Sequence, residues 1–115
     1  MGKTMNFKII SPKEIAIYQK QPGTILIDLR DKEDYDTGHI PGAVHIFHED
    51  LSGHYDYLRQ FEQIILYCDR GNQSMIAARD LSRLGMKPIE VYGGMQAYQD
   101  ALSRSQLEIL PVKKT

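Results

Sequence analysis

The sequence predicts an α/β domain, in which a mainly parallel sheet of about five strands carries helices on both faces. Short apolar runs alternate along the chain with helix-like segments, the order typical of a parallel sheet. Several of these runs have no polar alternation, as expected of strands that are buried on both faces. The 115 residues, 42% of them hydrophobic, suffice for one core, so we expect a single domain over residues 1–115.

Each expected strand is a short run of apolar and β-branched residues. The five runs are Lys8–Ile10, Ile25–Asp28, Ala43–Ile46, Ile64–Tyr67 and Ile89–Tyr92. The core should span about residues 6–102. The sequence leaves the conformation of the tail, residues 103–115, open.

The first helix should follow Ser11, which is a good N-cap. Pro12 then occupies the first helical position, and Glu14 completes a capping box. The stretch "EDLSGHYDYLRQFEQ", residues 49–63, is interpreted as a solvated helix over the sheet.

Two more helices are expected in the second half of the chain. One begins with Ser74 as its N-cap, carries apolar residues on one face and ends at Gly85, which suits the C′ position. The other is a short helix from Gly94 to Leu102.

Cys68, the only cysteine, directly follows the apolar run 64–67. Ligands of parallel α/β folds bind in loops beyond the carboxyl ends of the strands. The usual role of such a cysteine is that of a small buried hydrophobe. Residues 69–73, however, are all polar or glycine, which disfavours a dry environment. We therefore interpret Cys68 as a reactive thiol.

The loop after Cys68 has the composition of an anion cradle. Residues 69–74 should turn so that their N–H groups converge on the sulfur, and a helix N-terminus favours negative charge. Gly71 permits a positive φ, and Arg70 adds positive charge at the mouth. These features favour a thiolate nucleophile.

Three segments together resemble the rhodanese-like domain family. They are "IDLRDKEDYDTGHIPGAVHI" (27–46), "CDRGNQS" (68–74) and "VYGGMQAY" (91–98). They resemble, in the family's order, its first signature, its active-site loop and its closing Gly-Gly segment. Three positions depart from the family pattern. Tyr98 replaces a frequent Trp, Asp69 places a negative charge beside the nucleophile, and Gln73 stands where several members carry arginine.

The resemblance implies a rhodanese-type thiosulfate sulfurtransferase. Cys68 would be the catalytic residue, taking a sulfane sulfur from a donor such as thiosulfate and passing it, as a persulfide, to cyanide, a thiol or a protein acceptor. The loop residues expected to bind the sulfur-containing anion are Asp69, Arg70, Gly71, Asn72, Gln73 and Ser74. Asp28 and Arg30 could form an ion pair that braces the loops. No cofactor or metal is required.

The sequence disfavours two other functions and leaves a third open. Cysteine-dependent phosphatases use Cys-x5-Arg, whose arginine grips two phosphate oxygens, but the corresponding position here is Ser74. A sulfur carrier or persulfide-sensing partner with little activity on free thiosulfate is the open alternative, since Asp69 could repel a doubly negative donor. A purely structural module is disfavoured because such modules commonly lose the cysteine.

The histidines predict no metal site. His39 should hydrogen-bond within a turn, and the spacing of His45, His48 and His54 matches no zinc pattern.

Composition excludes several partners. Fourteen Lys and Arg against 15 Asp and Glu give a net charge of −1, which argues against nucleic acid or an anionic membrane. No segment has the length of a membrane span or the apolar core of a signal peptide. One cysteine forms no internal disulfide, so we expect a cytoplasmic location.

Overall fold

Five parallel strands form one sheet in the computed structural model, which describes residues 7–109 and side chains through residue 104. Their order is β1-β5-β4-β2-β3, so the two longest strands, β2 and β4, lie inside the sheet. The strands are β1 (Lys8–Ile10), β2 (Thr24–Asp28), β3 (Val44–His45), β4 (Gln63–Tyr67) and β5 (Pro88–Val91). The predicted α/β class with a parallel sheet is confirmed.

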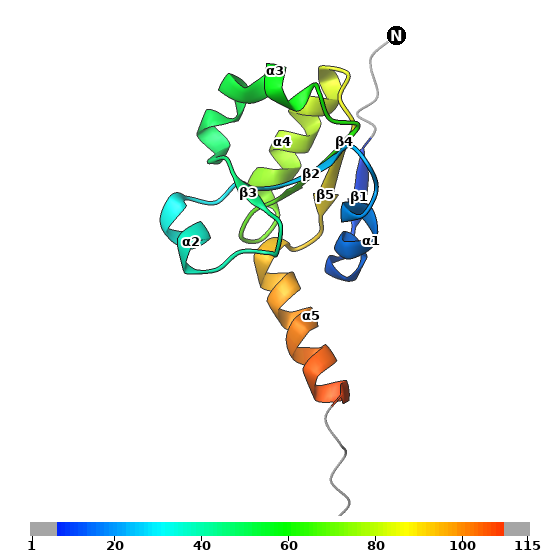
Figure 1. The fold of residues 1–115 in the computed structure, drawn as a ribbon. Helices are drawn as coiled ribbons and strands as arrows, with labels where there is room; N and C mark the ends of the chain where they lie inside the picture. The colour runs from blue at the N-terminus through cyan, green and yellow to red at the C-terminus, as the bar shows by residue number, and fades with distance from the viewer. Residues whose placement is uncertain (1–6, 110–115) are drawn as a thin grey trace, which may run out of the picture.

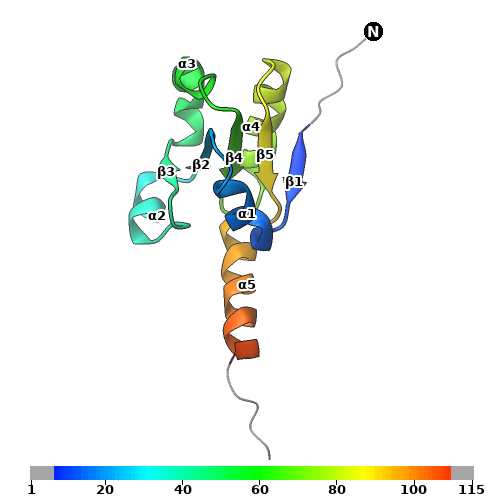
Figure 2. The ribbon, with the colours of Figure 1, turned by 45° about the vertical axis from the view of Figure 1, so that its right-hand side comes forward.

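Helices cover both faces of this sheet, and each face has its own core (Figure 2). The helical segments are η1 (Pro12–Glu14), α1 (Ile15–Gln19), α2 (Lys32–Thr37), η2 (His48–His54), α3 (Tyr55–Leu58), α4 (Asn72–Arg83) and α5 (Gly94–Ile109). Leu66 on β4 faces the core shared with α4, whereas its neighbour Ile65 faces the core shared with α1 and α5. Successive strand residues point to opposite faces, so continuous apolar runs fill both cores.

The first helix forms where the sequence predicts it, after Ser11. The Glu14 carboxylate accepts a hydrogen bond from the Ser11 N–H at 2.8 Å, which is one half of the expected capping box. The segment begins as the 3-10 turn η1 and continues as α1.

One helical prediction needs correction, and one helix was missed. The segment 49–63 is not one solvated helix: it comprises the 3-10 helix η2 and the short α3, and it buries Leu51 and Leu58 against the sheet. The helix α2 was not expected. Asp31 begins it, because its carboxylate accepts the N–H of Asp34 at 2.9 Å; an N-cap aspartate was the signal in the sequence.

The last helix is longer than predicted. Instead of ending at Leu102, α5 continues to Ile109 and projects away from the sheet (Figure 1). No glycine or proline interrupts residues 95–110, so nothing in the sequence stops the helix earlier. Of the tail left open above, residues 103–109 are thus helical, and 110–115 lie outside the described residues.

Candidate functional site

Cys68 lies at the carboxyl end of β4, where the loops after β2 and β3 also arrive. A hollow of about 340 Å³ opens there. Its lining residues are Leu29, Arg30, Asp31, Asp34, Phe47, His48, Cys68, Asp69, Arg70, Asn72 and Gln73. A larger hollow of about 640 Å³ lies at the opposite ends of β4 and β5. The smaller hollow is the candidate site because Cys68 lines it.

The sulfur of Cys68 is held by backbone N–H groups of its own loop. The N–H of Gly71 lies 3.1 Å from Sγ, and that of Ser74 lies 3.4 Å from it. The residue is only 4% exposed. Two N–H donors and the start of α4 therefore face the sulfur, an arrangement that favours negative charge on it.

The helix after the loop begins earlier than predicted. α4 starts at Asn72 with Gly71 as its N-cap, so the predicted capping role of Ser74 is wrong. Gly71 has φ of 109°, a conformation that glycine adopts without strain, and this moves the N-cap three residues forward, from the predicted Ser74 to Gly71. Ser74 consequently lies in the first turn, and its hydroxyl is not used as a cap.

The Ser74 hydroxyl instead joins the thiol to a buried acid. Its Oγ lies 3.5 Å from the Sγ of Cys68 and 2.6 Å from Oε2 of Glu90, with the Gly71 carbonyl at 3.2 Å. Ser74 is 0% exposed and Glu90 is 1% exposed. A hydroxyl can donate one hydrogen bond and accept others, so it can link two groups that exchange a proton.

Sequence reasoning missed Glu90. Its position inside the apolar strand β5 was the available signal, since a carboxylate is rarely placed there. Burial raises the pKa of Glu90, and the hydrogen bond from Ser74 offsets part of that rise. The Oε1 atom is buried and has no hydrogen-bond partner among the described residues.

The residues that follow the Gly-Gly segment after β5 hydrogen-bond to the backbone of the Cys68 loop. The N–H of Met95 donates to the Cys68 carbonyl at 2.8 Å, and that of Gln96 donates to the Asp69 carbonyl at 3.0 Å. A Cβ on Gly94 would lie 2.3 Å from the Cys68 carbonyl oxygen, and the residue has φ of 59°. Only glycine allows α5 to begin this close to the loop backbone.

The ion pair expected from the sequence is present beside the hollow. Arg30 Nη2 lies 2.8 Å from Asp28 Oδ2 and 2.6 Å from the Gly38 carbonyl, and the Tyr67 hydroxyl donates to the same carboxylate at 2.8 Å. Burial lowers the pKa of Arg30, but the hydrogen bond and charge of Asp28 raise it overall. The pKa of Tyr67 is also raised, mainly because burial disfavours its charged form. The network ties β2 and β4 to the loop that precedes β3.

The remaining loop side chains lie at the mouth of the hollow. Asn72 and Gln73 are exposed, and the side chains of Arg70 and Asp69 are 77% and 70% exposed. The two charges are 4.0 Å apart, a contact of little energetic weight at such exposure. Arg70 therefore remains available to an anion.

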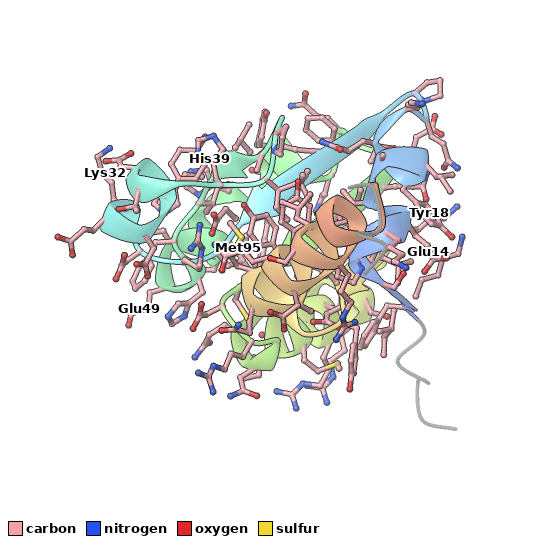
Figure 3. The ribbon with its side chains drawn as sticks, turned by 90° about the horizontal axis from the view of Figure 1, so that it is seen from below. Glu14, Tyr18, Lys32, His39, Glu49 and Met95 are labelled. Carbon is pink, nitrogen blue, oxygen red and sulfur yellow. The ribbon has the colours of Figure 1, made fainter. Side chains whose placement is uncertain are left out.

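The histidines have local partners. His39 accepts or donates through Nδ1 to the Tyr35 carbonyl at 2.8 Å and stacks on the Tyr35 ring, with centroids 3.8 Å apart. Viewed from the α5 side, it lies on the flank opposite Glu14, with Met95 between them (Figure 3). His45 Nε2 contacts the Arg30 carbonyl at 2.6 Å.

Two further observations concern metals and membranes. In the range 7–109, no group of three or more His, Cys, Asp or Glu side chains could hold a metal ion. The helices in that same range include none that is long and apolar enough to cross a membrane.

Named relatives of the chain take part in sulfur transfer. It is 36% identical to a tRNA sulfurtransferase of Pyrobaculum aerophilum, over 66% of this chain and 16% of that protein. It is 29% identical to the thiosulfate sulfurtransferase GlpE of Pseudomonas syringae, over 81% of this chain and 88% of that protein. Identity to the putative sulfur carrier protein YrkF of Bacillus subtilis is 35%, over 62% and 39%. The chain thus spans about a sixth of the tRNA sulfurtransferase.

A solved structure and a family model agree with these relatives. The rhodanese-like domain protein of Staphylococcus aureus superposes with a TM-score of 0.69 at 26% identity, covering 94% of this chain and all of that one. The model of the rhodanese-like domain matches residues 11–101. Together with the parallel sheet and the loop around Cys68, this match shows that the chain belongs to the rhodanese-like domain family.

Proposed function

We propose that this protein is a thiosulfate sulfurtransferase, which carries a sulfane sulfur on Cys68. One observation carries the proposal: the Cys68 sulfur accepts hydrogen bonds from two backbone N–H groups and lies at the edge of an open hollow. The sulfurtransferase relatives support the reaction class, and GlpE supports thiosulfate as the donor.

The reaction would proceed in two displacements. The Cys68 thiolate attacks the outer sulfur of thiosulfate, an S–S bond forms, and sulfite leaves with the electron pair of the broken S–S bond. A thiolate or cyanide then attacks the outer sulfur of the persulfide, and Cys68 leaves as a thiolate. The N–H groups of Gly71 and Ser74 stabilise the negative charge at both stages.

The remaining loop residues have proposed roles in donor binding. Arg70 attracts the anionic donor, and the exposed side chains of Asn72 and Gln73 contact it at the mouth of the hollow. Arg30, held by Asp28, keeps the opposite wall in place.

Intact mass measurement tests the proposal directly. Incubation with thiosulfate should add about 32 Da, the mass of one sulfur atom on a thiol nucleophile, and cyanide should remove it. The control is Cys68→Ser, which should gain no mass. A protein that gains no sulfur at any thiosulfate concentration, while its thiol still reacts with iodoacetamide, would exclude thiosulfate as donor.

A sulfur carrier or persulfide sensor is the second candidate. The exposed carboxylate of Asp69 beside the nucleophile favours it, because that charge opposes a doubly negative donor. The similarity to the carrier YrkF also supports it. Under this proposal the persulfide forms readily from a protein persulfide donor and only slowly from thiosulfate, which the same mass measurement distinguishes.

We propose that residues 1–115 act as a single rhodanese-like domain with a core of about residues 6–102. The family match over 11–101 supports these bounds. A cytoplasmic location is proposed because a reducing compartment keeps the thiol free.

A further inference from the structure

Glu90 is a buried acid for which the proposed sulfur transfer assigns no role. It lies on β5 beneath the start of α4, and it is 1% exposed. Among the described residues, the Glu90 side chain has one hydrogen-bond partner, the Ser74 hydroxyl, which lies 2.6 Å from Oε2, and Oε1 has none. An isolated carboxylate is costly to bury, so a sequence that retains one has either a structural or a chemical use for it.

The groups that face Glu90 single out the thiol. From the loop after β4 comes the backbone of Gly71, whose Cβ, if present, would lie 3.5 Å from Oε2. From α4 comes the Ser74 hydroxyl, which contacts Oε2 and also lies 3.5 Å from the Cys68 sulfur. The register partners of Glu90 on the flanking strands are Ile9 and Leu66. Cys68 is the titratable group in this set.

We propose that Glu90 stores the proton of Cys68, which reaches it through the Ser74 hydroxyl. In one form the thiol donates to Ser74 Oγ, and the Ser74 hydroxyl donates to the Glu90 carboxylate. In the other form the Glu90 carboxyl donates to Ser74 Oγ, and the Ser74 hydroxyl donates to the thiolate. One proton has moved from sulfur to Oε2, no electron has been transferred, and the buried triad keeps the same total charge.

Two effects act together against the ordinary acidities of the two groups, which favour the neutral thiol with an ionised Glu90 carboxylate. Glu90 is buried and forms no ion pair with any residue that the structure describes, which favours its protonated carboxyl. The N–H groups of Gly71 and Ser74, with the start of α4, favour the thiolate of Cys68. Because the two anions would repel each other, Glu90 and Cys68 should lose their protons in two coupled steps.

The relay serves both displacements of the proposed function, on which it rests. During loading, Glu90 holds the proton, so the thiolate attacks the donor without a second buried anion beside it. During unloading, Cys68 leaves as a thiolate, and the protonated Glu90 stabilises it through Ser74. Glu90 touches no reacting atom, so it is a positioning residue that acts through Ser74.

The rate of alkylation by iodoacetamide, followed from about pH 5 to 10, tests the relay without any sulfur donor, since the thiolate is the reactive form. The wild-type rate should rise in two steps, because ionised Glu90 opposes the second. Glu90→Gln, whose amide imitates the protonated carboxyl, should rise in one step and reach its plateau at lower pH. Glu62→Gln, an exposed acid far from the thiol, is the matched control and should follow the wild type.

Ser74→Ala gives a second, independent reading. It removes the shared hydroxyl and leaves Glu90 in place, so its profile should rise in one step at higher pH than that of Glu90→Gln, because the thiolate loses a donor. Superimposable wild-type and Glu90→Gln profiles would overturn the relay. If Glu90→Gln does not fold, a Ser74→Ala profile identical to the wild type would overturn it.

This test is separable from that of the proposed function. A two-step profile without a sulfur adduct would keep the relay and reject thiosulfate transfer. A sulfur adduct together with superimposed alkylation profiles would support thiosulfate transfer and reject the relay.

Discussion

Cys68 combines an apolar setting with donors aimed at its sulfur. The residue is 4% exposed, yet two N–H groups contact Sγ and the hollow opens beside it. Burial alone would favour the neutral thiol, whereas the N–H groups favour the thiolate. The nucleophilicity of Cys68 depends on the balance between these two effects.

Cys68→Ser should abolish the sulfur adduct and thiocyanate formation, because a hydroxyl is far less nucleophilic and forms no persulfide. The fold should persist, since serine is close to cysteine in volume. Circular dichroism and urea unfolding check the fold, and a cyanide assay checks transfer. Substantial thiocyanate production by the folded variant would reject the mechanism.

Arg70→Ala should raise KM for thiosulfate about fivefold, with a smaller effect on kcat, because an exposed pair contributes on the order of 1 kcal/mol to binding in both ground and transition states. Asp69→Ala should lower KM. Arg83→Ala, which removes an exposed arginine from the far end of α4, is the matched control. Unchanged KM in both loop variants would favour the carrier function.

Glu90 should make stability depend on pH. Burial raises its pKa in the folded state, so as pH rises above about 4.3, the ordinary value for glutamate, the unfolded chain releases the proton first and folding becomes less favourable. Below that pH both states hold the proton and no loss occurs. The loss grows until the pH reaches the folded-state pKa.

Urea unfolding measures this effect best in a Cys68→Ser background, which removes the titration of the thiol. Between about pH 4 and 7, the free energy of unfolding should fall by about 1–2 kcal/mol relative to the same protein with Glu90→Gln, a typical cost for a buried group lacking a partner. A constant difference across that range would show that Glu90 titrates normally.

At the scale of elements, the start of α5 sets the position of the loop. The N–H groups of Met95 and Gln96 bind the carbonyls of Cys68 and Asp69, so the Gly-Gly segment and the loop behave as one unit. The two N–H groups of the loop are thereby left to face the sulfur.

Gly94→Ala should destabilise the protein by at least about 2 kcal/mol, because its Cβ would lie 2.3 Å from the Cys68 carbonyl oxygen and its φ is positive. Gly85→Ala is the matched control: it also has a positive φ, but its Cβ would meet nothing within 4 Å. Urea unfolding and alkylation rates compare the two. Equal losses in the two variants would show that the close contact contributes nothing.

At the scale of the whole molecule, charge is nearly balanced. The net charge of −1 produces little long-range attraction for an anionic donor, so any salt effect should come from Arg70. Raising ionic strength from about 0.01 to 0.15 M shortens the Debye length from about 30 to 8 Å. This should raise KM for thiosulfate in the wild type by at most the factor that Arg70→Ala produces, and hardly change it in that variant. Equal salt dependence in both would point to a wider charged surface.

The sequence by itself determined the fold class, the strands and the location of the thiol. Continuous apolar runs can be buried on both faces only in a covered parallel sheet, and the polar loop after Ile64–Tyr67 placed Cys68 at the edge where ligands bind. The family motifs, which are local in sequence, were equally readable. Helix ends were less accessible: the length of α5 and the start of α4 at Asn72 depend on packing and on the φ of Gly71.

Only the tertiary structure decided which distant residues meet. Ser74 was expected to cap a helix, and Glu90 seemed an ordinary strand residue. The register of β4 and β5, with α4 laid across them, brings Glu90 to 2.6 Å from the Ser74 hydroxyl. Gly94 similarly meets the Cys68 carbonyl across 26 positions of sequence. Such contacts are set by how parallel strands and their crossover helices pack, and local sequence patterns carry no record of that packing.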